Sequence, residues 1–228
     1  MDKNSTYIYL SYFMNENTPL YGGSKGVEVK INSSLKNGDS SNTKKLSFHN
    51  HSGTHIDYPN HFILEGKTSE AYKAQDWVFY HPYLLEVKAE ENELISFSEA
   101  QLEKLPKEID FLILKTEFGA FRGQEKYWNY NPGLSPDLAN KLRNNFRNLK
   151  VIGMDFISIT SYQNREIGRL AHRQFLGGKN PLLLVEDMDL SSLKKTPRSL
   201  ICAPLLIENI DGSPVTIIAE IDSGADIT

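Results

Sequence analysis

The sequence predicts an α/β protein in which a strand-rich, mixed sheet is combined with few helices. Nine segments are rich in β-branched and aromatic residues, whereas only three segments carry the start or end signals of helices. Some helices lie between strands, but too few strand–helix–strand units occur for a doubly wound parallel sheet. The predicted strands span residues 7–13, 27–31, 45–49, 83–88, 109–115, 151–154, 182–185, 199–206 and 215–221.

Three segments are predicted as helices from their ends and their apolar spacing. Ser98 and Gln101 form a capping box at the start of the first helix. Ser135 and Pro136 open the second helix as N-cap and first helical residue, and apolar residues then recur at helical spacing. The third helix is predicted over residues 165–176 and ends at two glycines.

Length and charge limit the kind of protein. The 228 residues suit one domain, predicted to span residues 1–228. The net charge of −4, without a basic stripe, argues against nucleic acid as a partner. No stretch approaches the roughly 20 apolar residues that cross a bilayer, and the first residues lack the apolar region of a secretory signal. We therefore expect no membrane partner.

Cysteine usage points to a reducing compartment. Cys202 is the only cysteine, so an intramolecular disulfide and cysteine-based zinc sites are excluded. Because Cys202 lies in an apolar run, a buried structural residue is a better interpretation than a nucleophile. A cytoplasmic location is expected.

Four of the six histidines fall within residues 49–61, together with one aspartate. Imidazole and carboxylate are the ligands that Zn²⁺, Mn²⁺ and Fe²⁺ prefer, and open sites built from them leave room for water and substrate. A turn at residues 52–54 should bring His51 and His55 around one point. Asp57 lies two residues beyond His55, so both side chains share one side of an extended segment. The cluster predicts a metal or catalytic site.

A closed structural metal site is the alternative for this cluster, although such sites more often use cysteine. Pro59 stiffens the exit of the segment and helps to orient His61. Outside the densest part of the cluster, His49 is predicted to line the pocket and His81 to lie in a loop. Phe13 and the segment 119–132, which holds Trp128, are candidate pocket walls.

The segment His51-Ser-Gly-Thr-His55-Ile-Asp57-Tyr-Pro-Asn-His61 matches every fixed position of the HxGTHxDxPxH signature. The chain thus resembles the cyclase-like metal-dependent hydrolases, a family that includes kynurenine formamidases and isatin hydrolases. The resemblance extends to residues 10–23, 112–119, 153–155 and 172–186. It implies a swivelling β/β/α-type fold and a homodimer or homotetramer.

The resemblance also implies a role for each matching residue. It assigns His61 as the acid–base residue and Tyr21 as a neighbour of the substrate. The implied ligands of one or two divalent metals, Zn or Mn, are His51, His55, Asp57, His172 and Glu186. From the residues alone, a surface or helix-cap position is a better interpretation of His172 than a metal ligand, and Glu186 is equally compatible with a solvated strand end.

The resulting functional hypothesis is hydrolysis of a formamide or cyclic amide C–N bond in a small aromatic metabolite. A bound divalent metal lowers the pKa of water towards about 7, and histidine titrates near neutrality, so a metal and His61 suit amide hydrolysis. Alternatives are a lactam, imide or lactone hydrolase, or a small-metabolite cyclase. A metal-dependent small-molecule binding protein without turnover is the non-enzyme alternative.

Overall fold

The computed structural model describes residues 5–222, so the ends of the predicted domain 1–228 lie outside the described residues. The helices are α1 (Glu99–Leu102), α2 (Glu125–Asn129), α3 (Pro136–Asn145) and α4 (Arg165–Leu176). The strands are β1 (Ser5–Tyr9), β2 (Val27–Ser33), β3 (Thr43–Phe48), β4 (His55–Asp57), β5 (Val78–Phe79), β6 (Pro82–Glu86), β7 (Leu94–Ile95), β8 (Phe111–Lys115), β9 (Gly133–Leu134), β10 (Val151–Met154), β11 (Leu183–Glu186), β12 (Ser199–Pro204) and β13 (Gly212–Asp222). No helix within residues 5–222 is both long and apolar enough to cross a bilayer.

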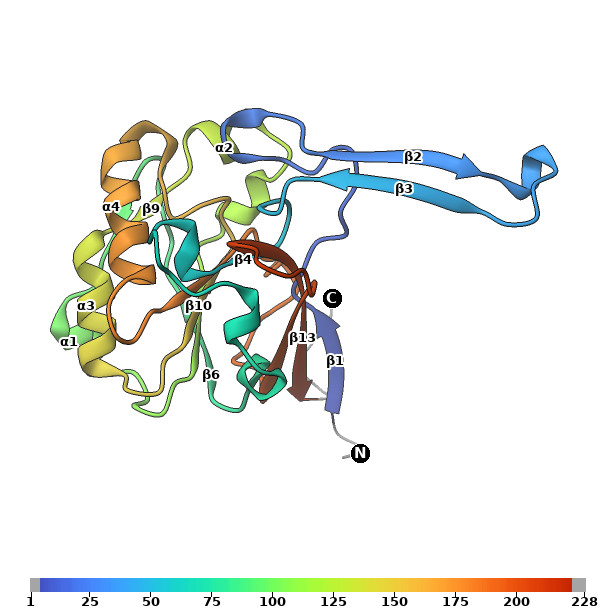
Figure 1. Cartoon of the computed structure of the whole chain (residues 1–228). Helices are drawn as coiled ribbons and strands as arrows, with labels where there is room; N and C mark the ends of the chain where they lie inside the picture. The colour runs from blue at the N-terminus through green and yellow to red at the C-terminus, as the bar shows by residue number, and fades with distance from the viewer. Residues whose placement is uncertain (1–4, 223–228) are drawn as a thin grey trace.

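Nine strands form one mixed sheet in the order β5-β12-β13-β4-β11-β10-β8-β6, with β1 also paired to β13. The four strands β6, β8, β10 and β11 run parallel, whereas β4 is antiparallel to both β11 and β13. Figure 1 shows α1, α3 and α4 on one side of the parallel strands, and β1 and β13 on the other. This arrangement confirms the predicted α/β class with a strand-rich mixed sheet and few helices.

The parallel strands are buried on both faces. In β8, Leu112 and Leu114 belong to the core beneath the helices, whereas Phe111 and Ile113 belong to the core shared with β12 and β13. Because successive side chains of a strand point to opposite faces, an uninterrupted apolar run fits a strand between two cores. The two cores fix the strands whose ends carry the site.

Several short elements were not predicted, namely β4, β5, β7, β9 and α2. The three residues of β4 lack an apolar pattern and are a strand because both edges are paired: Asp57 lies opposite Leu184 of β11 and Gly212 of β13. Helix α2 lies in the segment 119–132. The strand predicted to reach residue 13 ends at Tyr9, where its pairing with β13 ends.

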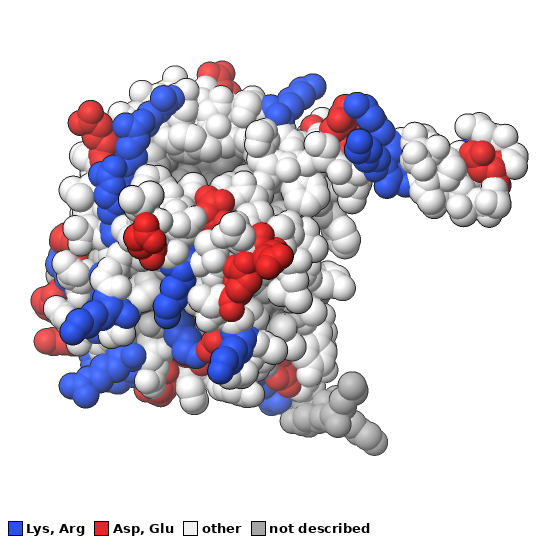
Figure 2. Space-filling view, in the orientation of Figure 1, with Lys and Arg blue, Asp and Glu red and all other residues white. Residues whose placement is uncertain are grey.

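Strands β2 and β3 form a separate hairpin that projects from the body of the molecule (Figure 1). Val29 pairs with Leu46, and Ile31 lies on the same face of the hairpin. The exposed fractions of Ile31 and Leu46 are 71% and 59%. Figure 2 shows that the arm also carries charged groups, with uncharged surface between them. The hairpin therefore presents an apolar strip that the described part of the chain leaves exposed.

Candidate metal centre and pocket

The segment from His51 to His61 begins with a tight turn. Gly53 has a φ of +64°, a conformation that favours glycine. Its carbonyl accepts a hydrogen bond of 2.9 Å from Nδ1 of His55. The turn brings the ring centroids of His51 and His55 to 5.1 Å, which confirms that the two side chains surround one point.

In strand β4, successive side chains point alternately to the site and to the core. Ile56 is fully buried in the core shared with β12 and β13. His55 and Asp57 lie on the opposite side and are only 5% and 1% exposed. This confirms that His55 and Asp57 share one side of an extended segment.

Asp57 lies in the middle of a group of side chains from distant segments. Its Oδ1 is 2.8 Å from Nδ1 of His51 and 3.5 Å from Nε2 of His55, and its Oδ2 is 3.6 Å from Nε2 of His172. Glu186 also lies between two histidines, 3.5 Å from Nε2 of His55 and 3.6 Å from Nε2 of His172. The structure thus brings together the five predicted ligands, called here the His/carboxylate cluster (His51, His55, Asp57, His172 and Glu186).

The two more distant members of the cluster are held by contacts within α4 and with the segment that follows β10. On α4, Nδ1 of His172 donates to the carbonyl of Gly168 at 3.0 Å, and Oγ1 of Thr160 lies 3.1 Å from the same nitrogen. At the end of β11, Glu186 accepts a 2.7 Å hydrogen bond from the N–H of Ile159. His172 is 3% exposed, so the surface position left open by the sequence is wrong. The inner face of α4 buries it because Gly168 packs directly on Thr160.

The donor set of the His/carboxylate cluster fits a divalent cation. His55 and His172 use Nδ1–H on backbone carbonyls, so Nε2 is the ring nitrogen that faces the carboxylates and is left to bind a cation. The Nε2–oxygen distances of 3.5 to 3.6 Å are too long for good hydrogen bonds. Buried Oδ2 of Asp57 has no hydrogen-bond partner among the described residues. Burial lowers the pKa of His172, but Asp57 and Glu186 raise it to about 9, so the centre favours positive charge.

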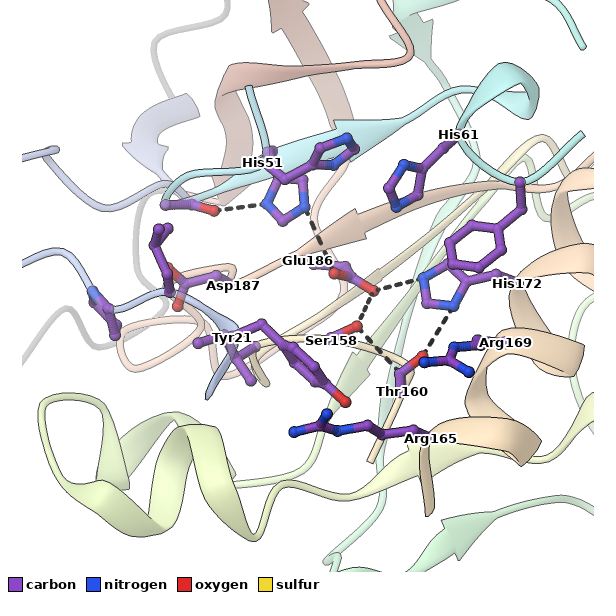
Figure 3. A pocket seen from close by; sticks show the side chains of 16 residues that line it. Tyr21, His51, His61, Ser158, Thr160, Arg165, Arg169, His172, Glu186 and Asp187 are labelled. Carbon is purple, nitrogen blue, oxygen red and sulfur yellow. Dashed lines mark hydrogen bonds and ion pairs between the residues drawn. The ribbon is translucent and has the colours of Figure 1, made fainter. Parts of the chain in front are cut away.

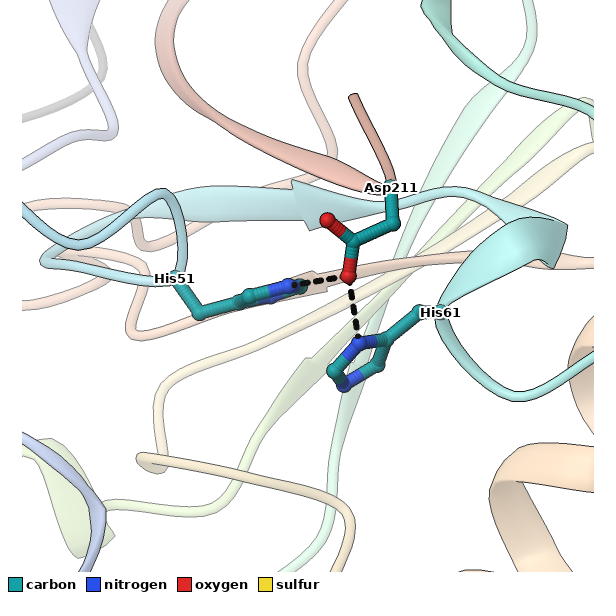
Figure 4. A group of neighbouring side chains, drawn as sticks. All are labelled: His51, His61 and Asp211. Carbon is teal, nitrogen blue, oxygen red and sulfur yellow. Dashed lines mark hydrogen bonds and ion pairs between the residues drawn. The ribbon is translucent and has the colours of Figure 1, made fainter. Parts of the chain in front are cut away.

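Asp211 joins His51 to His61, and sequence reasoning missed it (Figure 4). Its Oδ2 accepts from Nε2 of His51 at 3.0 Å and from Nδ1 of His61 at 2.9 Å, while Oδ1 accepts from Asn50 at 2.8 Å. The hydrogen bonds from the two histidines hold the pKa of Asp211 well below its usual range. A Cβ atom at Gly212 would lie 2.2 Å from Cε1 of His51, so glycine is required beside the aspartate. The Asp-Gly pair is a turn signal, but it does not indicate this partner.

A cavity of about 340 Å³ opens beside the His/carboxylate cluster, within the size range of small-molecule pockets (Figure 3). Tyr21 and His61 line it, which places both residues where a substrate could contact them. Arg165 and Arg169 of α4 also line it and were not predicted. The apolar part of the wall consists of Pro19, Leu20, Phe62 and Ile157.

Other predicted pocket residues lie elsewhere. His49 follows β3 at the base of the hairpin, is exposed and does not line this cavity, because pairing with β2 carries it away. Residues of the segment 119–132 line a second cavity, and Trp128 packs directly against Gly23. Phe13 is 84% exposed and lines a third depression. His81 is exposed between β5 and β6, as predicted.

The geometry is that of an open cluster of metal-ligand side chains beside a substrate-sized cavity. The chain belongs to the putative cyclase family, whose sequence model matches residues 8–161. Kynurenine formamidase from Bacillus cereus is 28% identical over 214 residues, covering 93% of this chain and 96% of that protein. Kynurenine formamidase from Bacillus cytotoxicus is 25% identical over 216 residues, covering 95% of this chain and 98% of that protein. The predicted family is confirmed.

Solved structures share the fold. Isatin hydrolase A from Labrenzia aggregata, bound to benzyl benzoate, has a TM-score of 0.81 at 21% identity, covering 95% of this chain and 94% of that chain. A structure described as a potential metal-dependent hydrolase with cyclase activity has a TM-score of 0.73 at 18% identity. The match covers 95% of this chain and 98% of that chain. At these identities the likeness establishes the fold.

Proposed function

We propose that this protein is a metal-dependent hydrolase that cleaves the formamide or cyclic amide C–N bond of a small aromatic metabolite, as an arylformamidase does. The observation that carries the proposal is the convergence of the His/carboxylate cluster at a cavity that His61 also lines. Similarity to kynurenine formamidases over 93% of the chain supports it. N-formylkynurenine is therefore the first candidate substrate.

We assign the His/carboxylate cluster to one or two divalent cations, Zn²⁺ or Mn²⁺, which imidazole and carboxylate ligands suit. Asp57 faces His51 and His55 with one oxygen and His172 with the other, so it would hold the cation or cations together with these three histidines. Metal content by mass spectrometry, after loading and gel filtration, distinguishes one ion from two per chain and zinc from manganese.

The side chains around the cavity have separate roles in the proposed reaction. When bound, the metal supplies Lewis acidity that polarises a carbonyl and lowers the pKa of water. Asp211 holds Nδ1–H of His61, so the Nε2 atom of His61 is available to accept a proton from the attacking water. Because an amine leaves poorly as an anion, His61 returns this proton to the leaving nitrogen. Tyr21 and Phe62 provide aromatic walls for the ring of the substrate.

The test is hydrolysis of N-formylkynurenine by protein loaded with Zn²⁺ or Mn²⁺, compared with chelator-treated protein. We expect rapid release of kynurenine that requires the metal and returns when metal is added back. No hydrolysis of N-formylkynurenine or other aryl formamides and cyclic amides by fully metal-loaded protein would refute the proposal.

We also propose a homodimer or homotetramer in which a second copy covers the apolar strip of Val29, Ile31 and Leu46 on the projecting hairpin. A single domain over residues 1–228 is supported by the one large sheet and tested by limited proteolysis. A cytoplasmic location is supported by Cys202, a buried free thiol, and tested by cell fractionation.

A further inference from the structure

Two arginines of α4 face the cavity without a counter-ion of their own. Arg165 and Arg169 are one helical turn apart, so they share a face of α4, and both line the cavity. Within residues 5–222, neither forms an ion pair with a carboxylate. Arg122 shows the contrast, because it binds Asp187 through two hydrogen bonds of 2.8 and 2.9 Å. The two arginines at the cavity are left to pair with something else.

The surroundings of Arg165 and Arg169 favour the binding of an anionic ligand. The Arg165 guanidinium lies 3.9 Å from the ring centroid of Tyr162, a contact that restricts its orientation. Figure 3 shows the Tyr21 hydroxyl beside Arg165, and both guanidinium groups on the side of the cavity away from His51 and His61. Burial raises the pKa of Tyr21 to about 12, so the hydroxyl keeps its proton.

We infer that Arg165, Arg169 and the Tyr21 hydroxyl form a subsite for a carboxylate of the substrate. The inference rests on the proposed function and names its substrate class: aryl formamides that carry a carboxylate on a side chain remote from the scissile bond. Planar guanidinium groups match carboxylates through paired N–H donors. Phe62 and Ile157 form part of the apolar wall of the same cavity. Such a substrate is held at its acid end and presents its formamide group to His61.

Helix α4 also provides a matched control. Figure 2 shows Lys and Arg side chains in a row over this helix, and its three arginines are all exposed at least in part. The third, Arg173, does not line the cavity. Arg173→Gln therefore removes the same charge from the same helix without touching the subsite.

The experiment compares N-formylkynurenine with its carboxamide, which differs only at the carboxylate, as substrates of metal-loaded protein. We expect the wild type to prefer the acid in kcat/KM. The variants Arg165→Gln and Arg169→Gln should raise KM for the acid about tenfold each, the effect of losing one charge-assisted hydrogen bond. In both variants, kcat for the acid and the kinetic constants for the carboxamide should stay within about twofold of the wild-type values. Arg173→Gln should leave the kinetic constants for both substrates unchanged.

Binding separates this inference from the proposed function. Calorimetry of kynurenine and kynurenine carboxamide requires no turnover, and the acid should bind more tightly to the wild type but not to the double variant Arg165→Gln/Arg169→Gln. Equal use of acid and carboxamide, or equal losses for both in the variants, overturns the subsite. Failure of the wild type to hydrolyse either compound removes N-formylkynurenine as the substrate of the proposed function, and calorimetry then still decides the subsite.

Discussion

Replacing Asp211 by asparagine tests how His61 is held. The two oxygens of Asp211 accept from opposite sides: Oδ1 from the Asn50 amide, and Oδ2 from His51 and His61. An asparagine amide has one oxygen and one NH₂ group. In Asp211→Asn, the new amide can be oriented in two ways. One orientation points its NH₂ group at the Asn50 NH₂ group, and the other points it at the N–H groups of the two histidines.

The size of the effect follows from these contacts. A hydrogen bond to a charged group contributes about 1.5–3 kcal/mol. Because the Asp211 side chain is 35% exposed, the lower part of this range applies. A loss of about 1.5–2 kcal/mol corresponds to a kcat about 10–30-fold lower, since about 1.4 kcal/mol changes a rate tenfold.

The assay is steady-state hydrolysis of N-formylkynurenine, with metal content measured on the same samples. The double variant Asn50→Asp/Asp211→Asn restores a donor–acceptor match on both sides and should recover part of the lost kcat. Asn50→Ala, which leaves the histidine contacts in place, should cost less than Asp211→Asn. An Asp211→Asn enzyme with full metal content and a kcat within twofold of the wild type would refute the reasoning.

The remaining predictions concern the metal, the packing and the hairpin. His61→Ala should keep its metal and lose most turnover, whereas Asp57→Ala should lose metal; equal metal content in the two variants, by mass spectrometry, would contradict this division. Gly212→Ala places a Cβ against His51, which should lower stability by about 1–3 kcal/mol in urea unfolding and weaken metal retention in dialysis. Ile31→Lys and Leu46→Lys should shift the protein to monomers in light scattering, while each monomer stays folded with a cooperative melting transition. An unchanged mass in light scattering would argue against the hairpin interface.

Local patterns were sufficient where an element is held by its own residues. The third predicted helix, over residues 165–176, coincides with α4. The apolar runs of β8 and β10 are strands because both of their faces are buried. Ser98 and Gln101 form the capping box predicted for α1. In each case the pattern that predicts the element lies in residues that are neighbours in the chain.

The rest depends on partners that are distant in the sequence. Asp211 contacts His61 across 150 positions, so the Asp-Gly pair indicated a turn but not its role. His172 looked like a surface residue because burial of that face of α4 requires Thr160, which comes from a different segment. Strand β4 has no apolar alternation and exists because β11 and β13 pair with its two edges.

The position of β4 explains why the His/carboxylate cluster and the sheet depend on each other. Its register sets His55 opposite Glu186 of β11 and Asp57 opposite Gly212 of β13. A shift of one residue would turn His55 and Asp57 into the apolar core and bring Ile56 to the cavity, because strand side chains alternate. The register that buries Ile56 is therefore the one that assembles the His/carboxylate cluster. Apolar burial on one face of β4 thus stabilises an arrangement of carboxylates on the other that favours bound positive charge.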